Sequence, residues 1–240
     1  MNRTDMTEKS RLMKKVGNLH QVIDVVPVTY RDGRADRMSA WQIKNGPLQF
    51  TVMKDKCLDI AELSYRGINF SFLSKPGLQG RNHYDTNGEE ALRSIMGGML
   101  FTCGLENICA VYRKDGKEYP MHGRIRTTPA EHAGVSVGCD EDRCTITVSG
   151  EMRQAELFGE NLVLKRTITT TWPGKEIRIR DVVENQGYQE TPMMLLYHFN
   201  AGYPLLDEGA KIIIPSVKTV PRDADAAAQL DCWDRMEAPV

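Results

Sequence analysis

The chain contains the stretch Leu162-Val-Leu-Lys-Arg-Thr-Ile-Thr-Thr-Thr-Trp172, then Pro173-Gly174, then Lys175-Glu-Ile-Arg-Ile-Arg-Asp-Val-Val-Glu-Asn185. Both flanks are rich in the β-branched residues Ile, Val and Thr, and Pro-Gly is a turn signal. The stretch therefore predicts an antiparallel hairpin of two long strands. In the second strand, alternation places Asp181 on the same face as the isoleucines. We expect Asp181 to pair with an arginine at the rim of the sheet.

Similar patterns recur on both sides of this hairpin. Gly134–Gly138 and Thr145–Gly150 are predicted strands joined by the turn Asp140–Arg143. Alternation of apolar and polar residues predicts further strands at Leu48–Met53, Ile68–Leu73, Met193–Asn200 and Lys211–Ile214. Short helical stretches are expected at Thr7–Lys15 and Glu89–Met96, and a loop at the Gly-, Pro- and Asn-rich segment Ser74–Asn87. Many short strands with regular turn signals predict an all-β protein built as a large β-sandwich.

The composition indicates a soluble globular chain, since the 240 residues are 41% apolar and 26% charged. We expect one domain over residues 1–240, with a lead-in segment at 1–18 that suits a short helix. Basic and acidic residues nearly balance, 31 against 32, which argues against a nucleic-acid partner. No apolar run is long enough to span a membrane, and the N-terminus lacks the apolar core of a secretory signal. The resulting prediction is a cytoplasmic protein without nucleic-acid or membrane partners.

Cysteine usage agrees with a reducing compartment. The six cysteines include no CxxC pair and no Cys/His cluster with zinc-finger spacing. Cys139 and Cys144 flank Asp-Glu-Asp-Arg and could face each other across a hairpin. We expect reduced, structural thiols rather than a disulfide, because disulfides are rare in the cytoplasm.

Several common catalytic motifs are missing from the sequence. It holds no GxGxxG, GxxxxGK[ST], HExxH or GxSxG, so nucleotide-dependent, zincin and α/β-hydrolase functions lack their usual support. Of the five histidines, two stand out. His122 precedes Gly123, which permits the close approach of a ligand or of another backbone. In the apolar segment Met193–Asn200, alternation places His198 and Asn200 on one face, where two polar side chains need polar company.

Six blocks of sequence carry a resemblance to a known family. They are Lys56-Cys-Leu-Asp-Ile60, Gly97-Gly-Met-Leu-Phe-Thr-Cys-Gly-Leu105, His122-Gly-Arg124, Gly159-Glu-Asn161, Asp181-Val-Val-Glu-Asn185 and Tyr197-His-Phe-Asn-Ala-Gly-Tyr-Pro-Leu-Leu206. With these blocks, in this order, the chain resembles the aldose 1-epimerase (galactose mutarotase-like) superfamily, and most closely a bacterial branch of unknown function. The last block is the most specific of the six.

The resemblance implies a β-supersandwich with a sugar site on the concave face of a large antiparallel sheet. It also implies catalytic roles, because His122 matches a sugar-binding histidine and His198 matches the general acid. Asp59, Arg124 and Asn200 match motif positions suited to holding sugar hydroxyls, although His198-Phe-Asn200 is spaced more tightly than in the best-known members. Anomer interconversion removes a proton from the anomeric hydroxyl and delivers one to the ring oxygen, and histidine's pKa of about 6.5 suits both transfers. The interpretation requires no cofactor and no metal ion.

Two departures from the family pattern affect these expectations. Lys56 stands where the branch has an arginine, which keeps the charge but loses the planar fork of a bidentate contact. Mutarotases take their general base from a glutamate on a late strand, whereas this sequence ends at Val240, before the region of that strand. Glu237, the last glutamate, does not match the base motif. We therefore expect a fold that is incomplete at the C-terminus and a base that is absent from these 240 residues.

Three hypotheses of function remain open. The leading one is an aldose 1-epimerase-like isomerase that acts on a monosaccharide or a derivative of one through His122 and His198. The second is a non-catalytic carbohydrate-binding module or sensor on the same fold. The third uses His122, His198 and Asp59 as ligands of a catalytic metal ion. An edge strand left open at the C-terminus could also pair with a second copy of the chain, giving a homodimer.

Overall fold

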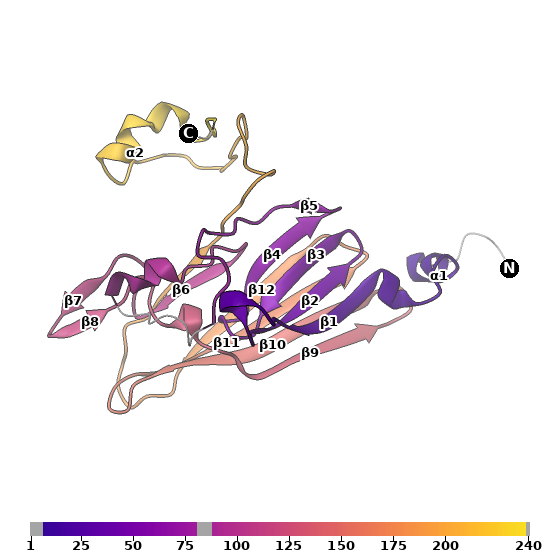
Figure 1. Cartoon of the computed structure of the whole chain (residues 1–240), viewed down its shortest axis with the longest axis horizontal. Coiled ribbons are helices and arrows are strands. Elements are labelled where there is room, and N and C mark those ends of the chain that lie inside the picture. Colours follow the sequence, from indigo (N-terminus) through magenta and orange to yellow (C-terminus); the bar gives the residue numbers. More distant parts are fainter. Residues whose placement is uncertain (1–6, 81–87, 239–240) are drawn as a thin grey trace.

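Two antiparallel β-sheets face each other in the computed structural model, which describes residues 7–80 and 88–238 (Figure 1). The five-stranded sheet has the order β1-β2-β3-β4-β5, with β1 at Ile23–Thr29, β2 at Ser39–Asn45, β3 at Leu48–Met53, β4 at Asp59–Tyr65 and β5 at Ile68–Asn69. The four-stranded sheet has the order β12-β11-β10-β9, with β9 at Glu131–Cys139, β10 at Cys144–Ala155, β11 at Asn161–Trp172 and β12 at Ile177–Asn185. The predicted all-β sandwich is confirmed.

Two smaller sheets lie beside the sandwich. Their strands are β6 at Phe101–Leu105 with β13 at Met194–His198, and β7 at Tyr112–Lys114 with β8 at Lys117–Tyr119. Backbone hydrogen bonds of the residues next to β6 and β13 connect this pair to β4 and to the segment after β5. Leu100 N donates to the carbonyl oxygen of Ile60 at 3.0 Å, and Phe72 N donates to the carbonyl oxygen of Asn200 at 2.9 Å. Strands from distant parts of the sequence are thereby held at one edge of the sandwich.

The hairpin that decided the fold class forms almost as predicted. β11 and β12 pair antiparallel with Arg166 opposite Asp181, and β12 begins at Ile177, two residues later than expected. β10 pairs with β11 along its whole length, from Cys144 opposite Trp172 onward. Buried side chains occupy every second position of β10, as a strand with one face in the core requires.

Apolar side chains fill the space between the two large sheets. The main core includes Trp41, Ile43, Phe50, Val52 and Ile60 from one sheet and Ile146, Val148, Met152, Leu164 and Ile168 from the other. A second cluster surrounds β6 and contains Met38, Ala40, Met53, Ala61, Met96, Phe101 and Cys103. Ala40 and Trp41 are neighbours in β2 yet belong to different clusters, because successive side chains of a strand point to opposite faces. The five-stranded sheet therefore has apolar packing on both faces.

A buried arginine cross-links both sheets. Arg166 donates from Nε and Nη2 to the two carboxylate oxygens of Asp181 at 2.9 and 2.7 Å, and from Nη1 to Asp59 at 2.7 Å. It also donates to the hydroxyl of Thr102 and to the carbonyl oxygen of Cys57. We call Arg166, Asp59, Asp181 and Thr102 the Arg166 network. Asp181 does pair with an arginine as predicted, but in the interior rather than at the rim, because Asp59 and Thr102 supply the further polar partners that burial demands.

Two predicted strands differ from the structure. The sequence predicts a strand at Lys211–Ile214, yet in this segment Lys211 forms an isolated bridge with Arg235, and Ile213 is 85% exposed. Alternation favours a strand only where a neighbouring strand supplies hydrogen bonds, and this segment has a single bridging residue. The strand expected at Ile68–Leu73 shortens to β5, and its remainder makes isolated bridges from Ser71 to Ala201 and from Leu73 to Gly97.

Helices are short. α1 spans Glu8–Met13 within the expected Thr7–Lys15, a 3-10 helix spans Gly88–Arg93, and α2 spans Ala224–Ala228 in the C-terminal segment, which extends away from the sheets (Figure 1). The predicted loop Ser74–Asn87 falls partly on residues 81–87, outside the described residues. None of the helices in the described ranges has the length and apolarity needed to cross a membrane.

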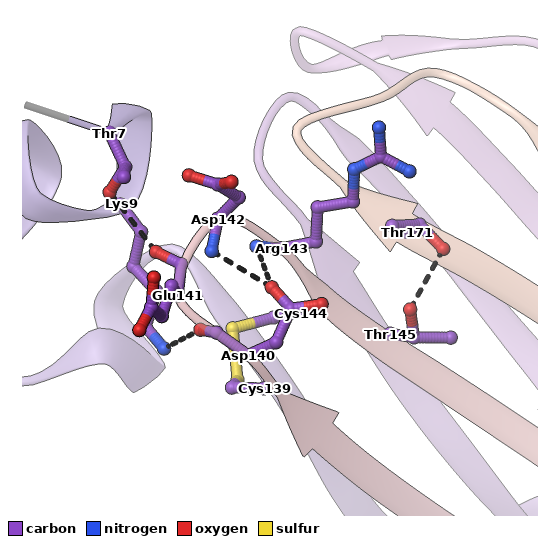
Figure 2. Close-up of a disulfide and its surroundings, with 10 residues drawn as sticks. All are labelled: Thr7, Lys9, Cys139, Asp140, Glu141, Asp142, Arg143, Cys144, Thr145 and Thr171. Carbon is purple, nitrogen blue, oxygen red and sulfur yellow. Dashed lines mark hydrogen bonds between the residues drawn. A yellow bond between two sulfur atoms is a disulfide. The ribbon is translucent and has the colours of Figure 1, made fainter. Parts of the chain in front are cut away.

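The turn between β9 and β10 corrects the expectation of reduced cysteines. Cys139 and Cys144 are directly opposite in the antiparallel register, with Cα atoms 4.1 Å apart, and they form a disulfide (Figure 2). Asp140 Oδ1 accepts hydrogen bonds from the backbone N–H groups of Asp142 and Arg143, which tightens the turn between them. The hairpin register thus places the two sulfur atoms together, a proximity that overrides the argument from compartment. The N-terminal segment also contacts this turn, through the hydroxyl of Thr7 and the ammonium of Lys9 (Figure 2).

The Arg166 network predicts a large loss of stability in Arg166→Met. The variant leaves Asp59 and Asp181 buried without their cation, and breaking a buried ion pair in this way costs about 3–5 kcal/mol. Urea unfolding monitored by circular dichroism measures the difference. The control is Arg178→Met, since Arg178 lies exposed on β12 and pairs with the exposed Glu176; it should change stability by less than about 0.5 kcal/mol. Equal stabilities of the two variants would contradict the assignment.

The disulfide predicts that the hairpin is sensitive to reduction. Dithiothreitol should lower the free energy of unfolding by about 2 kcal/mol, the loop-entropy value for a short closed loop. Cys139→Ser should lower it by a similar amount and abolish the response to dithiothreitol. Cys109→Ser, which removes an exposed free thiol, should retain that response. A wild-type protein that dithiothreitol leaves unchanged would show that the bond contributes nothing.

Candidate functional site

Pairing with β6 determines which way His198 points. In the β6–β13 register, His198 lies opposite Phe101 and Tyr197 lies opposite Thr102. Directly opposite residues share a face, so His198 projects on the side of Phe101 and Tyr197 on the side of Thr102. The Tyr197 hydroxyl donates to Asp181 at 2.9 Å, which attaches this second face to the Arg166 network. The network therefore holds β13 by one face and leaves His198 on the other.

His122 reaches the same place from a loop. Its carbonyl oxygen accepts a hydrogen bond from Gly104 N in β6 at 3.1 Å, and its N–H donates to the carbonyl oxygen of Cys109 at 2.9 Å. Gly123 makes this approach sterically feasible. Its φ is +70°, and a Cβ at this position would overlap the carbonyl oxygen of Gly104. The glycine after His122 is thus required by the backbone contact that places the histidine.

The two histidine rings lie close together in an edge-to-face arrangement. Their centroids lie 6.2 Å apart with ring planes at 80°, and the ring of Phe101 lies edge-on, 6.0 Å from His122 and 6.5 Å from His198. His122 is half-buried and His198 is exposed. His122 Nδ1 lies 3.1 Å from the carbonyl oxygen of Ile108. Because a carbonyl oxygen only accepts, Nδ1 carries the hydrogen, and the neutral ring keeps Nε2 as a free acceptor.

The surroundings of His122 favour its neutral form. Burial lowers the pKa of His122 below its ordinary value of 6.5, the hydrogen bond to Ile108 acts in the opposite direction, and the positive charges of Arg126 and His198 lower it further. His122 is therefore an uncharged hydrogen-bond acceptor at neutral pH.

Arg124 follows His122 by two residues and forms an ion pair with Glu106. Its Nη1 donates to Glu106 Oε2 at 2.6 Å. Glu106 follows β6, and its buried Oε1 has no hydrogen-bond partner among the residues that the structure describes. Burial raises the pKa of this carboxyl although Arg124 opposes the shift. Arg124 remains partly exposed, so its contact with sugar hydroxyls stays a prediction.

Asn200 and Asp59 occupy different environments. Asn200 Nδ2 donates to the carbonyl oxygens of Gly98 at 3.0 Å and His198 at 3.2 Å, which braces the chain just after β13. Asp59 is fully buried and accepts hydrogen bonds from Thr102 and Arg166. The structure therefore places Asn200 beside His198 and Asp59 in the interior.

Sequence reasoning missed two contributors to this region. Phe101 lies inside the block Gly97–Leu105 that carried the family resemblance, but nothing in that block signals a ring packed against both histidines. Glu106 gave no signal at all. Within residues 7–80 and 88–238 no cluster of three or more His, Cys, Asp or Glu side chains could hold a metal ion, so the metal hypothesis gains no support.

The fold and the comparisons define the class of protein. A crystal structure of a putative aldose 1-epimerase from Klebsiella pneumoniae subsp. pneumoniae MGH 78578 superposes with a TM-score of 0.83 at 20% sequence identity, over 90% of this chain and 57% of that one. The chain has an aldose epimerase-like β-sandwich fold. Residues 36–240 match the family described as Domain of unknown function (DUF4432), and the chain belongs to that family.

Other comparisons add little. A crystal structure of galactose 1-epimerase from Lactobacillus acidophilus NCFM gives 11% identity over 61% of this chain and 44% of that one, with a TM-score of 0.33 that is too low to bear on the fold. No curated protein sequence matches the chain. The chain spans 57% of the length of the Klebsiella structure, so this likeness defines the fold alone.

The geometry around His122 predicts an imidazole that titrates below its ordinary pKa of 6.5. Long-range 1H–15N spectra of the histidine rings, recorded across a pH series, measure the midpoint and the tautomer. We expect Nδ1 to carry the hydrogen in the neutral ring and the midpoint to rise in His198→Gln, which removes a neighbouring positive charge. A midpoint at or above 6.5 in the wild-type protein, or hydrogen on Nε2, would contradict the assignment.

Proposed function

We propose that this protein binds a monosaccharide or a derivative of one and interconverts its anomers by acid–base ring opening. The single observation that carries the proposal is the close pair of rings of His122 and His198, which come from distant parts of the sequence and meet beside Phe101. The fold, which matches that of the Klebsiella structure, supports a site for a small sugar.

The two histidines are suited to different steps. Neutral His122 offers Nε2 as an acceptor, which suits binding of a sugar hydroxyl. Exposed His198 is free to donate a proton to the ring oxygen as the C1–O5 bond breaks, while a solvent water molecule takes the proton of the anomeric hydroxyl and C1 becomes the aldehyde carbon. Rotation about C1–C2 and the reverse steps then close the ring as the other anomer.

Supporting residues hold this pair in position. We propose that Asn200 orients His198 through the carbonyl oxygen that it contacts, and that Arg124 holds a sugar hydroxyl beside its partner Glu106. Asp59 does not contact the sugar in this proposal, because its carboxylate already accepts hydrogen bonds from Thr102 and Arg166. Its role is to help hold the network that positions β13.

A binding-only role is the second candidate. One observation favours it: within the described ranges, neither His122 nor His198 has a carboxylate as hydrogen-bond or ion-pair partner. A site that binds a sugar without a paired base would work as a carbohydrate-binding module or sensor.

Anomer equilibration followed by polarimetry or NMR tests the proposal with a panel of aldoses. The wild-type protein should accelerate equilibration of at least one sugar, and His198→Asn should lower the catalysed rate by about 100-fold or more, the usual contribution of a general acid. His122→Asn should raise KM, because this variant loses a contact that binds the sugar. The control is His20→Asn, since His20 lies in the N-terminal segment and contacts Asp24.

Two outcomes would decide against parts of this assignment. A His198→Asn variant with the wild-type rate would exclude His198 as the acid. Saturable binding of a sugar in calorimetry without any acceleration of equilibration would favour the binding-only role.

A further inference from the structure

Two arginines are equally buried in this protein but differ in their partners. Arg126 and Arg166 are each 1% exposed. Arg166 uses its Nε–Nη2 edge to grip both carboxylate oxygens of Asp181. In Arg126 the same two nitrogens, Nε and Nη2, are buried and have no hydrogen-bond partner within residues 7–80 and 88–238, whereas Nη1 donates to the hydroxyl of Ser94 at 3.0 Å.

A buried guanidinium edge of this kind is a costly arrangement in isolation. Burying a cation without a paired anion carries a large desolvation penalty, which lowers the pKa of Arg126 to about 10. The Nε–Nη2 edge presents two parallel N–H donors, the geometry that matches two oxygens of a carboxylate or a phosphate. The Asp181 contact of Arg166 shows that this chain uses the edge in this way.

A second buried cation, Lys56, lies beside the segment of Arg126, because Cys57 N donates to the carbonyl oxygen of Thr128 at 2.9 Å, directly after the 3-10 helix Ile125–Thr127. Lys56 is 3% exposed. Its pKa is lowered to about 8, first by burial and then by the positive charge of Arg126, while Asp59 and Asp55 oppose the shift. Asp59 is already paired with Arg166, and Asp55 accepts a hydrogen bond from Ser39 N. The pair Lys56 and Arg126 therefore concentrates positive charge that no carboxylate contacts within the described ranges.

This cationic pair adjoins the histidine site. Arg126 lies in the 3-10 helix Ile125–Thr127, which follows directly on His122-Gly-Arg124 and packs against β6. Its charge is among those that act on His122. An anionic group held by Arg126 would thus lie next to a sugar ring bound between the histidines.

We propose that Lys56 and Arg126 bind one anionic group, a carboxylate or a phosphate, carried by the sugar derivative whose ring lies at His122 and His198. This inference rests on the proposed function and narrows its substrate to acidic sugars. Arg126 supplies the bidentate edge, and Lys56 supplies a compact positive charge that can donate a hydrogen bond to either anion.

Anion binding can be tested apart from catalysis. Thermal unfolding of the wild-type protein, followed in rising concentrations of sodium phosphate or sodium acetate against sodium chloride at equal ionic strength, should show stabilisation by one anion or both. The anion that stabilises more identifies the preferred group. Isothermal titration calorimetry with the same anion should give an affinity that falls at least about 30-fold in Arg126→Met, the usual loss when a buried charged contact is removed.

Matched variants separate the site from general charge effects. Arg178→Met removes an exposed arginine and should leave anion binding unchanged. Lys56→Met should weaken binding independently, which keeps the proposal testable if Arg126→Met does not fold. A wild-type protein that neither anion stabilises, or variants at Arg126 and Lys56 that respond like the wild type, would overturn the inference.

A substrate comparison distinguishes this inference from the proposed function. Equilibration rates are measured for galactose, galacturonate and galactose 6-phosphate. Faster equilibration of an acidic sugar, with the advantage lost in Arg126→Met, supports the inference. Equal rates for all three sugars, with no anion binding, overturn it while leaving the proposed function intact. Anion binding at Lys56 and Arg126 without acceleration of any sugar retains the site and removes the proposed function.

Discussion

The ion pairs of Arg166 are the constraint on which the rest of the structure depends. One guanidinium on β11 contacts Asp59 at the start of β4, Asp181 on β12 and Thr102 on β6, so it joins the five-stranded sheet, the four-stranded sheet and the small β6–β13 sheet. Because its partners are buried, any rearrangement that separates them exposes an uncompensated charge to an apolar interior. The packing of apolar side chains between the sheets is less directional, and this network fixes their relative positions.

The candidate site follows from that constraint through β13. Tyr197 donates to Asp181, which commits one face of β13 to the network and leaves His198 on the opposite face, beside Phe101. His122 is brought to the same point by a different device, a backbone contact to β6 that only a following glycine permits. A rigid ionic cross-link and a close backbone approach therefore position the two histidines independently. The ring of His122 is further oriented by Ile108, which determines its tautomer.

The sequence predicts local features well and buried polar partners poorly. The β11–β12 hairpin can be predicted from the sequence because the turn Pro173-Gly174 and the β-branched flanks act locally. The polar side chain of His198 within an apolar strand likewise marks this residue as unusual. The ion-pair partners of Asp181 and Asp59 cannot be predicted from the sequence, because they depend on which strands meet in three dimensions. For the same reason, alternation in Lys211–Ile214 predicts a strand that does not form, since the segment makes an isolated bridge to Arg235 and no ladder with any strand that the structure describes. No feature of the sequence predicts that Arg126 is buried, because the burial of a charged side chain cannot be inferred from its neighbours in the chain.

The pairing of β13 with β6 also has a consequence for synthesis of the protein. Phe101 and His122 leave the ribosome long before His198, so the chain carries half of the site while its partner strand does not yet exist. Until β13 arrives, the open side of β6 and the carboxylate of Asp181 lack their final contacts. Long-range pairings of this kind form late and slowly. The nascent chain therefore passes through a stage in which a strand edge is exposed to other chains, and His198 joins His122 and Phe101 only when that edge closes.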